Sequence, residues 1–254
     1  MRSLTLFERF FTFSFRKCFG GFCQFTPANG LIDTYTTPAG GPALPNLYFY
    51  HDPMCSWCWG YRPVSDQLFT ALPDGVRRIN IVGGLAADDE QPMPADMQAY
   101  LSQTWRRIET MLGTEFNHQY WTECSPRRST YPACRAVLAA AEQDAYEPMV
   151  DAIQRAYYLR AMNPSDIATL EQLAAELDLD GNKFSADLRS QAVNEELLSQ
   201  TRFAARSPIR GFPSLALELD GSLHPVRQDY ESHLPTLEHL RALLSDPIRR
   251  PASG

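Results

Sequence analysis

The sequence predicts an α/β protein of the order β-α-β … β-β-α, in which a large all-helical insertion separates the two halves of one small sheet. Three observations lead to this fold class. Residues 47–93 contain a strand, a helix and a second strand, and residues 207–246 contain two strands and a helix. Between them, residues 94–206 form consecutive amphipathic segments without a strand pattern. A chain of 254 residues with 44% hydrophobic residues suffices for one such domain with an insertion.

The first strand and helix are predicted on either side of a cysteine pair. The segment NLYFYHD at 46–52 is rich in aromatic residues, as buried strands are, and the following Asp52-Pro53 ends it. A helix is expected from Ser56 to about Ala71, where apolar residues recur at helical spacing. The segment VRRINIVGG at 76–84 is the second strand, and its Gly-Gly exit marks a turn.

Five amphipathic segments fill the insertion. Ser165 and Asp166 are residue types that begin helices, and Gly181 is of the type that ends them. The helices are expected over residues 94–112, 131–144, 147–161, 165–178 and 183–206.

The pattern returns to strands after the insertion. GFPSLALEL at 211–219 is a strand, Asp220-Gly221 is a tight turn, and SLHPV at 222–226 is the partner strand. LPTLEHLRALL at 234–244 is a closing helix.

Both ends of the chain are expected to lie outside this fold. Residues 1–46 are predicted to be a disordered extension ending in a Pro/Gly/Thr-rich linker, and residues 247–254 a frayed tail. A secretory signal is disfavoured because Glu8 and Arg9 interrupt the apolar run of the extension. The cysteines of the extension receive no role.

Composition excludes several classes of function. A formal net charge of -7 and a pI of about 5.3 argue against a nucleic-acid partner. No run approaches 18 apolar residues, so no membrane span is expected. Six cysteines are too few for a disulfide-built scaffold of this length, and one tight pair among them indicates a reactive centre in a cytoplasmic protein. The sequence carries no signal for the oligomeric state.

The tight pair lies in DPMCSWCWG at 52–60. Cys55 is placed between the strand and the helix, where free N–H groups and the positive end of the helix dipole stabilise a thiolate. Cys58 follows one turn later on the same face. We expect Cys55 to be the exposed nucleophile and Cys58 the sheltered cysteine that resolves a mixed disulfide. The alternative is half of a structural zinc site, but no second such pair and no closely spaced histidines accompany it, so no metal is expected.

Each residue that flanks the pair has a chemical and a structural interpretation. His51 either supplies positive charge or a proton, or points to solvent at the end of the strand. Asp52 either tunes the cysteines and accepts a proton from Cys58, or shapes the turn before the next proline, which is the favoured interpretation. Trp57 and Trp59 either surround the disulfide with apolar surface or pack in the core.

Two further cysteines lie in the insertion. Cys134 begins the helix expected at 131–144, where it is reactive if exposed and inert if buried; burial is the more common case. A bridge between Cys124 and Cys134 is disfavoured in a reducing cell.

The last candidate site is Gly211-Phe212-Pro213, at the start of the third strand. A proline there cannot donate a hydrogen bond to the sheet, and a cis bond in a turn against the active site would explain its place. Such a turn would leave the backbone of Phe212 free to pair with an extended substrate.

Three segments, YFYHDPMCSWCWG, STYPACRAVLAA and GFPSL, resemble the DsbA-like branch of the thioredoxin superfamily, and within it the FrnE-type group and its relative 2-hydroxychromene-2-carboxylate isomerase. The resemblance covers about residues 47–245. It implies a thioredoxin fold with a helical insertion, thiol–disulfide exchange at Cys55 and Cys58, and a cis-proline role for Pro213. In the isomerase relative a serine replaces the nucleophilic cysteine and glutathione is the cofactor, whereas this chain keeps both cysteines. No cysteine follows Cys134, so the additional C-terminal pair of the FrnE type is missing.

These observations favour a DsbA-like thiol–disulfide oxidoreductase that acts on thiol- or disulfide-containing proteins or small molecules. No cofactor is expected, with glutathione as the candidate redox partner. Two alternatives stay open: a glutathione-dependent isomerase or transferase, and a non-catalytic thiol metal-binding or chaperone module whose helical insertion binds clients.

Overall fold

The computed structural model describes residues 44–246, and its first strand begins at Asn46. The predicted extension lies outside the described residues as far as position 43, and so do its cysteines, Cys18 and Cys23. The predicted tail, residues 247–254, also lies outside them.

One mixed sheet of four strands, in the order β2-β1-β3-β4, runs through the described part of the chain. Its strands are β1 (Asn46–His51), β2 (Arg77–Val82), β3 (Ser214–Leu219) and β4 (Ser222–Val226). β1 pairs in parallel with β2 and antiparallel with β3, and β3 pairs antiparallel with β4. The segments before and after the insertion therefore build a single sheet, and the predicted fold class is confirmed.

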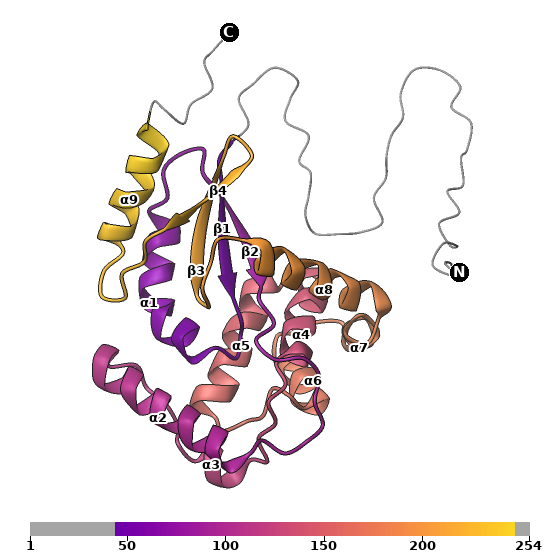
Figure 1. Ribbon diagram of the computed structural model, residues 1–254. Coiled ribbons are helices and arrows are strands. Elements are labelled where there is room, and N and C mark those ends of the chain that lie inside the picture. The colour runs from indigo at the N-terminus through magenta and orange to yellow at the C-terminus, as the bar shows by residue number, and fades with distance from the viewer. Residues whose placement is uncertain (1–43, 247–254) are drawn as a thin grey trace, which may run out of the picture. The chain divides into compact units, whose positions relative to one another are not determined.

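Helices cover both faces of this sheet, as Figure 1 shows. The covering helices are α1 (Ser56–Thr70), α8 (Gln191–Arg206) and α9 (Leu234–Ser245). Because side chains alternate along a strand, Leu47 and Phe49 of β1 pack with α1 and α9, in a cluster that includes Leu68 and Leu237. Tyr50 points to the other face, where it packs with Ala204 of α8.

The insertion forms its own apolar core. Its helices are α2 (Ala95–Leu112), α3 (Tyr120–Glu123), α4 (Tyr131–Ala141), α5 (Tyr146–Leu159), α6 (Ile167–Glu176) and α7 (Gly181–Leu188), followed by α8. Helix α4 is alanine-rich and buried along most of its length, so its small side chains let α5, α7 and α8 pack closely around it. Met54 and Val82 also join this core, which connects the insertion to the sheet beside the cysteine pair.

Two predictions within the insertion are wrong. The single helix expected over 183–206 is divided into α7 and α8, because the Ser190 side chain accepts a hydrogen bond from the Val193 N–H at 3.1 Å and starts a new helix. Gly181 does not end a helix but begins α7, since Asp180 caps that helix. The short helix α3 was not predicted.

Within residues 44–246, no helix is long and apolar enough to cross a membrane.

Candidate active site

Cys55 occupies the N-cap position of α1, between β1 and the first helical turn. Its sulfur accepts a hydrogen bond from the backbone N–H of Cys58 at 3.4 Å, one of the donors that a helix start leaves unpaired. Both thiols are free. The predicted strand–cysteine–helix arrangement is therefore observed, with two close but unbonded cysteines at a helix N-terminus.

The expected difference in exposure between the two cysteines is not observed. Cys55 is 6% exposed and Cys58 is 4% exposed, so both are buried. The two cysteines line different cavities. Cys55 lines an open pocket of about 220 Å³ together with Trp57 and Phe212, whereas Cys58 lines a separate cavity of about 30 Å³. Of the two thiols, Cys55 therefore borders the larger pocket.

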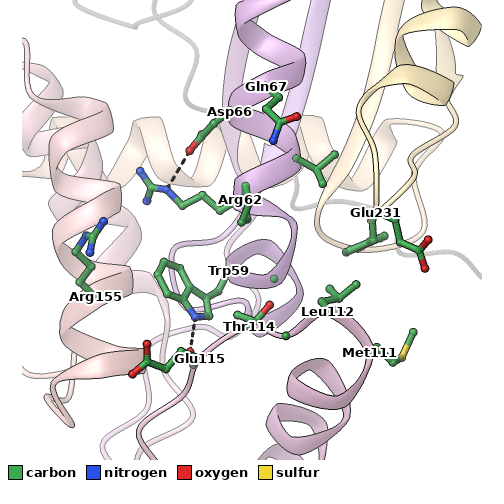
Figure 2. Close-up of a pocket in the computed structure, with 15 residues that line it drawn as sticks. Trp59, Arg62, Asp66, Gln67, Met111, Leu112, Thr114, Glu115, Arg155 and Glu231 are labelled. Atoms are coloured by element: carbon green, nitrogen blue, oxygen red, sulfur yellow. Dashed lines mark hydrogen bonds and ion pairs between the residues drawn. The ribbon is translucent and has the colours of Figure 1, made fainter.

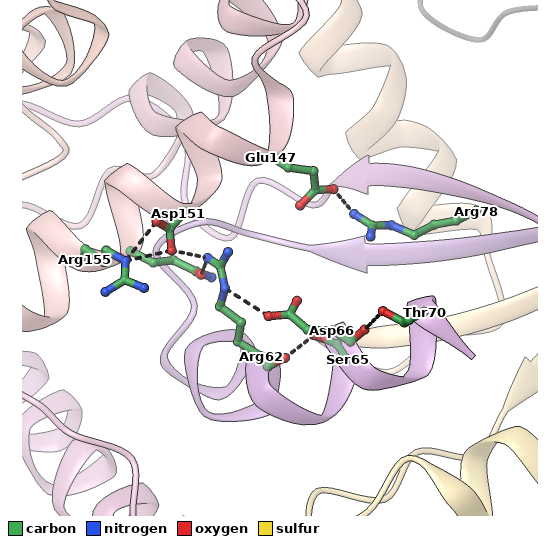
Figure 3. Close-up of polar contacts among 9 residues, drawn as sticks. Arg62, Ser65, Asp66, Thr70, Arg78, Glu147, Asp151 and Arg155 are labelled. Carbon is green, nitrogen blue, oxygen red and sulfur yellow. Dashed lines mark hydrogen bonds and ion pairs between the residues drawn. The ribbon is translucent and has the colours of Figure 1, made fainter. Parts of the chain in front are cut away.

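The small cavity against Cys58 is bordered by a polar network that Figure 3 shows. Arg62 of α1 pairs with Asp66 and with Asp151 of α5, and Arg78 of β2 pairs with Glu147 of α5. These ion pairs tie the sheet and α1 to the insertion. They also bring two guanidinium groups close to the buried end of β1.

His51 lies in this environment, and the interpretation that places it in solvent is wrong. It is 3% exposed rather than solvent-facing, and its Nε2 is 2.8 Å from the Tyr146 hydroxyl. Burial lowers the pKa of His51 to about 3, with help from the positive charges of Arg78 and Arg62. The ring is thus neutral at physiological pH and supplies no positive charge.

Asp52 is fully buried, and its carboxylate accepts four hydrogen bonds. Oδ1 accepts the backbone N–H of Met54 at 2.8 Å, which is the turn contact favoured from the sequence. Oδ2 accepts the Leu85 N–H at 2.8 Å, the Thr130 hydroxyl at 2.7 Å and the Cys134 thiol at 3.5 Å. One carboxylate thereby connects β1, the segment after β2 and the start of α4.

Burial also dominates the electrostatics of the Cys58 and Asp52 pair. Burial raises the pKa of Asp52, and the hydrogen bonds to its carboxylate oppose this shift only in part. The pKa of Cys58 is raised well above its ordinary value by burial and by the contact with Cys55, and the charge of Asp52 raises it further. Both groups therefore hold a proton to higher pH than they would in water.

The backbone of Phe212 lies against Cys55. The Cys55 thiol donates a hydrogen bond to the Phe212 carbonyl oxygen at 3.4 Å, and the Phe212–Pro213 peptide bond is cis. The Phe212 ring packs over Gly83 at the end of β2, where a Cβ atom would overlap the ring. Gly83 therefore leaves the space that the Phe212 ring occupies, and the position of Phe212 depends on it.

The two tryptophans of the motif divide between the two expected roles. Trp57 is half-buried and lines the pocket at Cys55, edge-on to the ring of Tyr230. Trp59 instead packs against the insertion, stacked on Tyr158, and its Nε1 donates to the Glu115 carbonyl oxygen at 3.0 Å. It faces a groove of about 750 Å³, drawn in Figure 2. Neither cysteine of the pair lines this larger groove.

The insertion cysteines are not bonded to each other. Cys124 is half-buried, and its thiol donates to the Ala161 carbonyl oxygen at 2.8 Å. Cys134 is fully buried, and burial together with Asp52 raises its pKa well above the ordinary value. The structural interpretation of Cys134 is therefore the better one, although its contact with Asp52 was not foreseen.

Sequence reasoning missed Thr130 and Tyr158. Thr130 stands two residues before a proline at a helix start, which is a capping signal, but its hydroxyl binds Asp52 instead of capping α4. The Tyr158 hydroxyl is buried without a hydrogen-bond partner among the described residues, and the charges of Cys55 and Cys58 raise its pKa further. In the described region, no group of three or more His, Cys, Asp or Glu side chains could hold a metal ion.

Two curated proteins are similar to part of this chain. The chain is 27% identical over 186 residues to the ClpXP adapter protein SpxH of Bacillus subtilis, covering 69% of this chain and 59% of that protein. It is 26% identical over 157 residues to SpxH of Halalkalibacterium halodurans, covering 59% of this chain and 51% of the other. This chain thus spans less than two thirds of the length of these curated relatives.

Solved structures match over most of their length. A structure from Nitrosomonas europaea, described as that of a candidate protein disulfide isomerase, aligns with a TM-score of 0.69 and 26% identity over 79% of this chain and 97% of that chain. The cytosolic disulfide reductase DsbM of Pseudomonas aeruginosa aligns with a TM-score of 0.64 and 26% identity over 78% of this chain and 98% of that chain. The family model of the DSBA-like thioredoxin domain matches residues 46–231, and the chain therefore belongs to the DSBA-like thioredoxin domain family.

Proposed function

We propose that this protein is a thiol–disulfide oxidoreductase in which Cys55 is the nucleophile and Cys58 the resolving cysteine. The observation that carries the proposal is the position of Cys55. Its sulfur caps α1, faces the Phe212 carbonyl oxygen and borders an open pocket, whereas Cys58 is enclosed behind it. The similarity to a disulfide reductase at 26% identity supports the same chemistry.

The reaction moves two electrons from the dithiol to a disulfide substrate. The Cys55 thiolate attacks one sulfur of the substrate, forms a mixed disulfide and releases the first substrate thiolate, which takes up a proton. The Cys58 thiol then loses its proton and attacks the Cys55 sulfur. The second substrate thiolate leaves, and the protein keeps a Cys55–Cys58 disulfide. The reverse sequence oxidises a substrate dithiol.

Asp52 is the proposed acceptor of the Cys58 proton. Loss of this proton is difficult because Cys58 is buried and its pKa is raised. Asp52 acts on the same thiol through both its backbone N–H and its carboxylate. Because burial also raises the pKa of Asp52, the carboxylate is a better base than an ordinary aspartate. The backbone of Phe212 would align the substrate beside Cys55.

A small thiol such as glutathione is the proposed source of electrons, in a cytoplasmic protein. One related structure is the cytosolic disulfide reductase DsbM with GSH, at 25% identity and a TM-score of 0.62 over 78% of this chain. The retention of both cysteines favours redox exchange over an isomerase that needs a single thiolate.

An insulin-reduction assay with dithiothreitol tests the proposal. The wild-type protein should speed insulin precipitation, and Cys55→Ser should abolish this effect. Cys58→Ser should instead accumulate a mixed disulfide at Cys55, detectable by mass. Cys124→Ser is the matched control, because a serine hydroxyl can replace the thiol that donates to Ala161. Equal activity of wild type and Cys55→Ser would contradict the proposal and favour a non-catalytic binding module.

A further inference from the structure

The pocket beside Cys55 has an uneven distribution of charge. Arg127 and Arg128 line it, and no aspartate or glutamate does. The other two cavities described above mix both signs: the groove along α1 includes Asp66, Glu115 and Glu231, and the cavity at Cys58 includes Asp66 and Glu147. A purely cationic lining is unexpected in a chain with a formal net charge of -7.

The two arginines are not equally available. Arg127 pairs with Asp166 at 2.6 Å and with Glu90 at 3.8 Å, so its charge is balanced by carboxylates of the protein itself. Arg128 is exposed, and its guanidinium donates a hydrogen bond at 3.6 Å to the Met97 sulfur, which is a weak acceptor. Among the described residues, no carboxylate pairs with Arg128, so its guanidinium can bind an anion from solution.

Besides four hydroxyl residues, Ser56, Thr104, Ser129 and Thr130, the rest of the lining is mainly apolar and aromatic. Met54, Trp57, Trp105 and Phe212 are among its lining residues. Its volume of about 220 Å³ is below the usual range for ligand sites, so the pocket suits a small molecule better than a folded partner. Arg128 is also close enough to this lining for its charge to act on Tyr157 of α5. The occupant should therefore combine a short apolar part with a negative group.

We propose that this pocket selects small disulfides and thiols that carry a carboxylate, which Arg128 binds while Cys55 attacks the sulfur. This inference rests on the proposed oxidoreductase function and adds the charge class of its substrate. With such a disulfide, the Cys55–Cys58 dithiol gives up two electrons and two protons. The products are the protein disulfide and two molecules of a carboxylate-bearing thiol, so no further oxidant or reductant is needed.

Three small disulfides of similar size and different charge provide the test. They are 3,3′-dithiodipropionate, bis(2-hydroxyethyl) disulfide and cystamine, which are anionic, neutral and cationic. The rate constant for oxidation of the reduced protein is measured with each and divided by the rate constant of the same disulfide with free dithiothreitol. This ratio removes differences in intrinsic reactivity. The normalised rate constant should be about tenfold higher for the anionic disulfide than for the cationic one, as expected for a partly desolvated charge-assisted pair.

Matched variants identify the residue responsible. Arg128→Gln should lower the normalised rate for the anion by about fivefold and leave the neutral disulfide unchanged, whereas Arg128→Lys should keep most of the preference. Arg202→Gln, which removes the same charge from an exposed position on α8, should change nothing. Reaction with all three disulfides at equal normalised rates, or an anion preference that survives in Arg128→Gln, would overturn this inference. A protein that is no faster than dithiothreitol with any of them would instead refute the oxidoreductase function itself.

Discussion

The thiol of Cys134 lies 3.5 Å from Oδ2 of Asp52, although the two residues are 82 positions apart in the sequence. The same oxygen accepts the Thr130 hydroxyl at 2.7 Å. Two donors from the start of α4 therefore act on a carboxylate whose charge raises the pKa of Cys58. The helical insertion is in this way part of the electrostatic environment of the cysteine pair, and not only a support for the sheet.

Thr130→Val should shift the pH dependence of mixed-disulfide resolution to higher pH. Valine has nearly the same shape but removes one hydrogen bond to the charged form of Asp52, so the pKa of Asp52 should rise further. Loss of such a bond, worth about 1.5 kcal/mol, corresponds to about one pH unit. The measurement is the rate of Cys58 attack on a preformed mixed disulfide, followed by acid quench at several pH values.

Thr130→Ser is the control, because it keeps the hydroxyl and should keep the profile of the wild type. A Thr130→Val profile that coincides with the wild type would show that Asp52 does not accept the Cys58 proton.

His51 should make the protein less stable in mild acid. Its pKa is lowered to about 3 in the folded state by burial, then by Arg78 and Arg62, whereas an unfolded histidine titrates near 6.5. Below that value the unfolded chain binds a proton that the folded protein excludes, so the free energy of unfolding falls as the pH falls toward 3. The slope should approach about 1.4 kcal/mol per pH unit.

Urea unfolding at pH 7.5 and 5.0 measures this loss in the wild type and in a His51→Phe/Tyr146→Phe double variant. The second substitution removes the hydroxyl that pairs with His51. Asp52 acts with the opposite sign: its raised pKa adds stability at low pH that is lost as the pH rises through its folded value. Since Asp52 is present in both proteins, their difference isolates His51. If the free energy of unfolding falls equally in both proteins between pH 7.5 and 5.0, His51 is not the group that causes the loss.

The element order and the cysteine position could be predicted because they depend on local pattern. Aromatic and apolar runs identified β1 and α1, and a cysteine at a strand-to-helix junction becomes an N-cap whatever the distant contacts are. The interaction of Asp52 with Thr130 and Cys134 could not be predicted, because it joins positions 78 and 82 residues apart across the insertion. The burial of His51 depends likewise on α5 covering the end of β1.

The break between α7 and α8 has a different cause. The apolar spacing continues through residues 183–206, so periodicity alone predicts one helix. The division depends on a single side chain, Ser190, whose hydroxyl accepts the Val193 N–H. Ser190→Ala should lower the free energy of unfolding by about 1 kcal/mol. Chemical denaturation measures this loss, and redox activity should be retained; an unchanged stability would mean that the cap does not define the break.

Gly83→Ala should impair disulfide exchange through Phe212. A Cβ atom at position 83 would overlap the Phe212 ring. The backbone carbonyl of Phe212 accepts the hydrogen bond from the Cys55 thiol. Because the ring must move, the backbone opposite Cys55 should move with it. A displacement of this kind can reduce the exchange rate by about tenfold to a hundredfold, and overpacking should lower the free energy of unfolding by about 1–3 kcal/mol.

The double variant Gly83→Ala/Phe212→Leu separates these two effects. A smaller side chain at position 212 leaves room for the added methyl group, so both stability and the exchange rate should recover. Gly181→Ala is the control for the substitution itself, since a Cβ there meets nothing within 4 Å. Stopped-flow exchange with a model disulfide gives the rates. If Gly83→Ala loses stability but exchanges at the wild-type rate, the backbone of Phe212 does not position the substrate, and that part of the mechanism is wrong.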